Sequence, residues 1–136
     1  MFTLFIVTPE RVVFEKPVKS LVVPGSEGYL GVLSHHAPLI TALQPGKIEF
    51  ADAQDKVHVM AVSGGFLEVS HNSATILADT VERADEIDLA RAEAAYERGR
   101  AHLVSVSKGE ISADLQAVQE ALERARNRIR IYKETH

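Results

Sequence analysis

The sequence predicts a β-sandwich followed by an antiparallel hairpin of two helices. All five prolines lie before residue 46 and six of the eight glycines before residue 66, between short runs of β-branched and other apolar residues. Many short strands separated by glycine and proline are typical of a small antiparallel sandwich or barrel. Beyond about residue 85 there is no proline, alanine, arginine and glutamate dominate, and apolar residues recur at helical intervals. We therefore expect two units, residues 1–84 and 85–136.

Short apolar or alternating segments predict the strands of the first unit. Residues 2–7 and 21–23 are apolar runs with β-branched residues, and residues 66–69 and 75–77 follow the same pattern. Residues 47–50 and 57–61 alternate, as half-buried strands do. His71, Asn72 and Ser73 suit a hairpin turn between two strands, and residues 52–55 suit another.

Two apolar stripes predict the two helices of the second unit. They are Leu89, Ala92, Tyr96, Gly99, Leu103 and Val106, and then Leu115, Val118, Leu122, Ala125, Ile129 and Tyr132. Asp85 is the predicted N-cap of the first helix, Gly109 its stop signal, and Ser112 the predicted N-cap of the second. Because the stripes are thin and rich in alanine, we expect the hairpin to be only marginally stable by itself.

Composition excludes several classes of function. With 46% hydrophobic and 25% charged residues, the chain is of ordinary globular composition. The absence of cysteine excludes disulfides, thiolate metal sites and thiol catalysis. A net charge of −4 argues against nucleic acid as a partner. No apolar run approaches the roughly 20 residues of a membrane-spanning helix, and residues 1–7 lack the basic start of a signal peptide.

Catalytic motifs are missing, so the sequence predicts no enzyme and no metal site. Gly25, Gly28 and Gly31 do not have the spacing of a dinucleotide-binding loop and are read as turn residues. His35 and His36 are adjacent, which favours a structural or interface role over a shared metal. Gly64 and Gly65 favour a bulge or tight turn, the alternative being an oxyanion-binding nest.

The end of the second predicted helix carries a run of positive charge. Its residues are Arg124, Arg126, Arg128, Arg130 and Lys133, with no acidic residue among them. Arg124 and Arg128 are one helical turn apart, so their guanidinium groups can hold phosphate or carboxylate oxygens together. The alternative is a solvated face whose cations stabilise the helix C-terminus.

An ordered set of motifs carries a family resemblance. VTPER stands at residues 7–11, PGSEGYLGVL at 24–33, HAPL at 36–39, LQPG at 43–46, SGGFLEV at 63–69 and LADT at 77–80. In this order and spacing the chain resembles the epsilon subunits of bacterial F-type ATP synthases over essentially its whole length. The resemblance implies a sandwich of about ten strands followed by two helices. It also implies a non-catalytic subunit of the rotating central stalk, which couples proton flow to ATP synthesis.

The resemblance also implies partners. The sandwich of such proteins binds the gamma subunit and the membrane c-ring, and Glu27 and His36 match positions in the loops that face the ring. Tyr29 and Ser34 depart from the family pattern, since relatives often carry a carboxylate and a proline there. The helices lie folded or extend along gamma toward the alpha and beta subunits, and the extended form blocks ATP hydrolysis. Such a subunit is peripheral, held by its partners at the cytoplasmic face of the bacterial plasma membrane.

Some members of the family bind ATP as a regulatory ligand, although none requires a cofactor. The segment IDLARA at residues 87–92 matches their motif, which implies roles for Ile87, Asp88, Arg91 and Ala92. Arg124 and Arg128 match the arginines of the last helix, and Glu82 matches a polar residue before the first. The alternative is that Asp88 caps the first helix and Ile87 packs on the sandwich.

Two other readings remain open from the sequence. One is a free-standing small-molecule-binding sandwich with a helical lid, and the other is an enzyme built around His35 or His36. Neither accounts for the ordered motifs. Co-purification with a gamma subunit distinguishes both from a rotor subunit.

Overall fold

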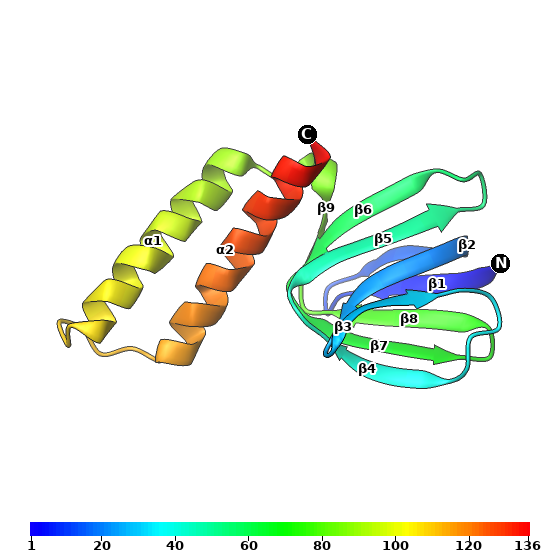
Figure 1. Ribbon diagram of the computed structural model, residues 1–136, viewed down its shortest axis with the longest axis horizontal. Coiled ribbons are helices and arrows are strands. Elements are labelled where there is room, and N and C mark those ends of the chain that lie inside the picture. The colour runs from blue at the N-terminus through cyan, green and yellow to red at the C-terminus, as the bar shows by residue number, and fades with distance from the viewer. The chain divides into compact units, whose positions relative to one another are not determined.

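The computed structural model describes residues 1–136, which separate into two compact units, Met1–Arg83 and Ala84–His136. Figure 1 shows strands in the first unit and helices in the second, which confirms the expected fold class. The strands are β1 (Phe2–Val7), β2 (Val12–Gly25), β3 (Gly28–Val32), β4 (Leu39–Leu43), β5 (Gly46–Asp52), β6 (Val57–Val62), β7 (Gly65–Ser70), β8 (Ser73–Ala78) and β9 (Val81–Arg83). The second unit contains the 3-10 turn η1 (Ala84–Glu86) and the helices α1 (Leu89–Ser107) and α2 (Leu115–Thr135).

The long strand β2 belongs to both layers of the sandwich. Its first half pairs with β1, and its second half pairs with β3 and β5. Strand pairing gives one layer β2–β1–β8–β7–β4 and another β3–β2–β5–β6–β9, and the pair Gly25–Leu43 also joins β4 to the end of β2. All pairs are antiparallel except β1 with β8. β1 forms an antiparallel hairpin with β2 on one side. On its other side it pairs with β8, whose direction is set by the β7–β8 hairpin, and the two strands run parallel. The nine strands are close to the number that the resemblance implies.

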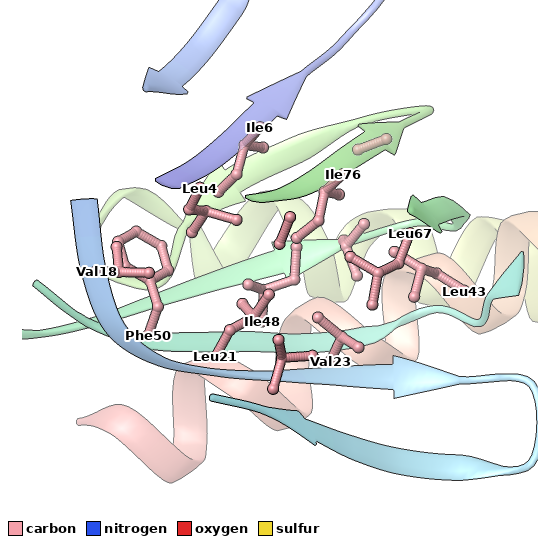
Figure 2. Packing of buried hydrophobic residues seen from close by; sticks show 14 of the residues in the cluster. Leu4, Ile6, Val18, Leu21, Val23, Leu43, Ile48, Phe50, Leu67 and Ile76 are labelled. Carbon is pink, nitrogen blue, oxygen red and sulfur yellow. The ribbon is translucent and has the colours of Figure 1, made fainter. Parts of the chain in front are cut away.

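Alternating residues of both layers fill the core (Figure 2). In β1 the side chains of Phe2, Leu4 and Ile6 are buried and the intervening ones are not, as period-two geometry requires. Ile48 and Phe50 meet them from β5. Each fully buried large apolar side chain contributes about 1.5–3 kcal/mol, so this cluster accounts for most of the stability of the unit.

Sequence patterns missed three short strands. β3 contains two glycines in five residues, β4 is half exposed, and β9 has only three residues, so none shows a strong apolar pattern. Their place is set by pairing with longer strands: β3 on β2, β4 on β7 and β9 on β6. In β6 the structure buries Met60, Ala61 and Val62, with Met60 opposite the core residue Ile48, whereas Val57 of the predicted alternation is exposed.

The two helices bury residues of both predicted apolar stripes. Ala92 of α1 and Val118, Leu122 and Ala125 of α2 are buried. The other members of the predicted stripes are half-buried, except Leu115, which is exposed. Ile131 is fully buried although it lies outside the predicted stripe.

Both predicted N-caps are wrong. Asp85 lies inside η1, and Asp88 caps α1 by accepting a hydrogen bond from the Arg91 backbone N–H at 3.1 Å. Ser112 is likewise replaced by Asp114, whose carboxylate accepts from the backbone N–H groups of Gln116 and Ala117. In both cases a carboxylate nearer to the helix satisfies the free N–H groups of the first turn.

Gly109 ends α1 as predicted. Its φ of 73° lies in the left-handed region, and its backbone N–H donates to the Val106 carbonyl while that of Glu110 donates to the Ser105 carbonyl. These two bonds form the Schellman motif that commonly ends a helix at glycine.

Candidate functional site

The outer face of β3 forms an exposed surface at the edge of its layer. Tyr29 and Leu33 are 56% and 64% exposed, and the open position of Gly31 lies between them. Strand alternation places these residues on the same side, and Glu27 lies in the turn just before β3. The Tyr29 hydroxyl accepts the Lys47 backbone N–H at 3.1 Å, which holds the ring across the neighbouring strands. We call Glu27, Tyr29, Leu33 and His36 the β3 surface.

Glu27 and His36 lie at opposite ends of this surface, separated by the five residues of β3. At about 3.3 Å per residue that strand is roughly 16 Å long. Gln44 holds the Glu27 end, since its amide Nε2 donates to the carbonyl of Ser26 at 2.6 Å and to that of Gly25 at 3.2 Å. A partner that contacts both residues must therefore lie along β3.

The loop of residues 33–38 forms the other end and carries His35 and His36. A β-turn opens it, with the His36 backbone N–H donating to the Leu33 carbonyl at 3.2 Å. The His36 ring Nδ1 donates to the Ala37 carbonyl at 2.7 Å, so Nε2 is the nitrogen that can face a partner. No group of three or more His, Cys, Asp or Glu side chains in residues 1–136 is arranged to hold a metal ion.

A second exposed surface lies on the outer face of the other layer. Ile40 and Phe66 are 73% and 56% exposed, and Leu77 is 52% exposed. Phe66 lies directly opposite Ala42 on β4 and Leu77 on β8. We call Ile40, Ala42, Phe66 and Leu77 the β4–β8 surface. Sequence analysis missed it because its strands carry apolar residues on both faces.

The predicted nucleotide-binding residues at the start of the helical unit are of two kinds, buried and exposed. Ile87 and Ala92 are buried and pack inside the molecule. Asp88 and Arg91 are exposed at the start of α1, where Asp88 performs the capping role that we considered as its alternative. The exposed face of the motif therefore offers the Arg91 side chain and a carboxylate with one oxygen already engaged.

The arginines of α2 lie level with this part of α1. Gly99 faces Leu122, and the Arg126 guanidinium lies 6.0 Å from the ring centre of Tyr96. In an antiparallel pair the residue numbers at one level have a constant sum, so Arg128 lies within about one turn of Arg91 along the hairpin, and Arg124 one turn further on. Arg124 is exposed and Arg128 is half-buried.

Local partners engage other members of the basic run. Arg126 pairs with Glu123 at 3.6 Å, and Arg130 donates to the side-chain oxygen of the buried Asn127 at 2.6 Å. The sequence pattern did not identify Asn127 as a core residue. Glu82, the remaining predicted nucleotide-binding residue, lies in β9 of the sandwich opposite Ala61 and is half-buried.

A polar cluster in the β5–β6 hairpin was also missed. His58 stacks on Phe50, with ring centres 4.8 Å apart, and its Nε2 donates to the Asp52 carboxylate at 2.9 Å. Asp52 also accepts the backbone N–H groups of Gln54 and Lys56. The hydrogen bond from His58, aided by those two, lowers the pKa of Asp52 below its ordinary value, although partial burial opposes the shift. The cluster fixes the turn that the sequence predicted at residues 52–55.

Gly64 and Gly65 serve backbone packing. Their φ values of 134° and 139° are open to glycine alone, and a β-carbon on Gly65 would lie 2.0 Å from the Leu77 carbonyl oxygen. The Gly64 carbonyl accepts the Asp79 backbone N–H at 3.0 Å. This is a close approach of two chain segments, and the structure shows neither the expected bulge nor a tight turn at these residues.

Two family models match the chain in the order of its two units. Residues 1–84 match the β-sandwich domain of the ATP synthase delta/epsilon chain, and residues 85–133 match its long α-helix domain. The chain is 46% identical over 127 residues to the ATP synthase epsilon chain of Desulforamulus reducens, which covers 93% of each chain. It is 52% identical over 100 residues to that of Pelotomaculum thermopropionicum, 74% of each chain.

Solved structures share the fold. A chain of the Euglena gracilis mitochondrial ATP synthase OSCP/F1/c-ring structure matches with a TM-score of 0.81 at 24% identity, covering 98% of this chain and 80% of that one. A chain of the Tetrahymena thermophila central stalk/c-ring structure matches with a TM-score of 0.60 at 16% identity, covering 98% and 94%. Neither helix of this chain is long and apolar enough to cross a membrane.

Proposed function

Because the chain belongs to the family of ATP synthase delta/epsilon chains, we propose that it is a non-catalytic subunit of the rotating central stalk of a proton-translocating F-type ATP synthase. The observation that carries this proposal is the match of both units, in order, to relatives named ATP synthase epsilon chain. In this role the chain couples proton flow to ATP synthesis and performs no bond chemistry itself. It is peripheral at the cytoplasmic face of the plasma membrane and reaches the membrane only through its partners.

The sandwich provides two surfaces for two partners. In the β4–β8 surface Ala42, Phe66 and Leu77 form an apolar row across three strands, with Glu68 opposite Ile40 beside it, and this row suits a stable interface with the gamma subunit. The β3 surface combines exposed apolar side chains with Glu27 and His36, which suits the c-ring. Exposed apolar patches of this kind mark interaction sites in soluble proteins.

The helical unit provides regulation. In the hairpin form few large apolar side chains are buried, Val118, Leu122 and Ile131 among them, so a modest free-energy bias can shift the population to an extended form. The basic run on α2 then contacts acidic segments of the alpha and beta subunits and inhibits ATP hydrolysis. ATP held by Arg91, Arg124 and Arg128, with Asp88 bonded to base or ribose, favours the hairpin because it binds that state better.

Co-purification tests the proposal. The tagged chain, co-expressed with a gamma subunit from one of its relatives, should elute as a stoichiometric complex. Phe66→Glu and Leu77→Glu should abolish the complex, because each buries an unpaired charge in the β4–β8 surface. Val57→Glu is the matched control, since Val57 is equally exposed but lies on another strand. A wild-type chain that elutes alone would instead favour the free-standing ligand-binding sandwich.

A further inference from the structure

We propose that Asn72, in the turn between β7 and β8, is the positioning residue of the His36 end of the β3 surface. The inference rests on the proposed contact with the c-ring and deepens it. The side-chain oxygen Oδ1 of Asn72 accepts the His35 backbone N–H at 2.8 Å, although the two residues are 37 positions apart. This contact joins the loop of residues 33–38, which leads from β3 into β4, to the turn between β7 and β8.

The loop needs such a contact because its turn has unfavourable residues. His35 occupies the third position of the β-turn that begins at Leu33, and its φ is 61°. A positive φ at that position alone defines a type II turn, which normally has glycine there and often proline before it. Here those two positions hold His35 and Ser34, so the turn conformation carries a free-energy cost. The hydrogen bond to Asn72 offsets part of that cost.

Asn72 is itself held rigidly. His71 and Asn72 have φ values of 50° and 55°, the pattern of a type I′ turn, and they connect the paired residues Ser70 and Ser73. The side-chain Nδ2 of Asn72 donates to the Met1 carbonyl at 3.0 Å, and its backbone carbonyl accepts the Thr3 N–H at 3.3 Å. The Asn72 side chain therefore joins two other backbone segments, the loop of His35 and the start of β1.

The consequence concerns the two residues that the loop presents. Leu33 is 64% exposed and His36 lies beside it, so both are accessible at the end of β3. The backbone conformation of the turn sets the direction in which these two side chains point. If Asn72 fixes the turn, a partner meets a preorganised surface and loses less conformational entropy on binding.

Three variants distinguish the effects of the two side-chain hydrogen bonds of Asn72, to His35 and to Met1. Asn72→Gly keeps the positive φ of the turn without strain and removes both side-chain bonds. Asn72→Asp keeps an acceptor for the His35 N–H but loses the donor to Met1. Adding His35→Gly to Asn72→Gly removes the strain that the lost bond had offset. Hydrogen exchange of the His35 amide measures whether its hydrogen bond to Asn72 is present. Affinity for ATP synthase membranes stripped of their epsilon chain measures the effect of that bond on binding.

We expect Asn72→Gly to expose the His35 amide to exchange and to weaken membrane binding by about fivefold to tenfold, the worth of one hydrogen bond. Asn72→Asp should stay within about twofold of wild type, and the double variant should regain most of the affinity. Unchanged affinity in Asn72→Gly, unchanged protection of the His35 amide, or an equal loss in Asn72→Asp would each overturn the inference. A wild-type chain that does not bind the stripped membranes would instead refute the proposed function.

Discussion

Gly99 of α1 packs directly against Leu122 of α2 in the helical hairpin. A β-carbon on Gly99 would lie 3.2 Å from Cδ1 and 3.7 Å from Cα of Leu122. The first atom is the end of a flexible side chain and the second is backbone. Only a small residue therefore fits without separating the helices, which is how a thin stripe still gives close packing.

Side chains of increasing size at position 99 should test the contact between Gly99 and Leu122. Gly99→Ala gains up to about 1 kcal/mol of helix propensity and needs only a small shift of the Leu122 methyl, so stability should stay equal or rise. Gly99→Leu should destabilise the hairpin by about 1–3 kcal/mol through overpacking. The control is Ala94→Leu, since Ala94 is exposed on the same helix. Urea unfolding followed by helical circular dichroism measures all three, and a tolerated leucine at both positions would contradict the packing.

Gly65→Ala should destabilise the sandwich severely, by more than about 3 kcal/mol. Its φ is closed to alanine, and its β-carbon would overlap the Leu77 carbonyl, a rigid backbone group. Gly31→Ala is the matched control, because Gly31 has open space around it. Thermal unfolding of the two variants should differ by many degrees, and similar melting temperatures would show that the β7–β8 approach is not tight.

Asp52 should make the free energy of unfolding depend on pH. Its pKa is lower in the folded than in the unfolded chain, so its contribution is complete above the unfolded value of about 3.9 and is lost as the pH falls through the folded pKa. Asp52→Asn should therefore be less stable than wild type at pH 7, and the difference should shrink below pH 4. Urea unfolding at a series of pH values measures it.

Asp55→Asn is the control for that series. Asp55 lies in the same hairpin, and its exposed carboxylate pairs with Lys19 at 2.8 Å. Exposed pairs contribute at most about 1 kcal/mol. If both variants lose the same stability at every pH, the Asp52 cluster does not have the special role assigned to it.

ATP should stabilise the isolated chain against heat. A ligand that binds only the folded hairpin raises stability by about 2.7 kcal/mol at 100 times its Kd. Arg124→Ala and Arg128→Ala should reduce the shift in melting temperature. Arg126→Ala should retain it, because Arg126 is engaged with Glu123 and lies near Tyr96. No shift at millimolar ATP, or an equal loss in all three variants, would count against the site.

Inhibition of hydrolysis should depend on the charge of α2. A chain with Arg124, Arg126, Arg128 and Arg130 all replaced by alanine should inhibit a reconstituted ATP synthase less than wild type does. Alanine is a strong helix former, so α2 should persist in the variant. The measurement is ATP hydrolysis by the complex, with circular dichroism to verify the helix. Inhibition equal to that of wild type would exclude the basic run as its cause.

Particular elements show how far the sequence could predict the fold. β1 was predicted because it is an apolar run with β-branched residues, and α2 because its apolar residues recur at helical spacing. β3 and β4 were missed, since they are short and half exposed and are held by pairing with β2 and β7. The caps were misplaced because several acceptors lie near each helix start, and only the backbone path selects among them.

The candidate site likewise contains residues that the sequence could identify and residues that only tertiary contacts reveal. Glu27, His36 and the arginines of α2 could be selected from sequence, because residue type and resemblance identify them. Asn72 and Asp52 could not, since their roles depend on partners brought close by strand register.

By itself, the sequence determined the two units, the sandwich-plus-hairpin class and the family, because composition, periodicity and ordered motifs are properties of the chain. Tertiary structure alone decided which exposed residues share a surface, which carboxylate caps each helix and which amide holds the loop of His36. The physical reason is that hydrogen bonds and close contacts between distant segments depend on position in space, and their energies of about 1 kcal/mol each leave no periodic trace in the sequence.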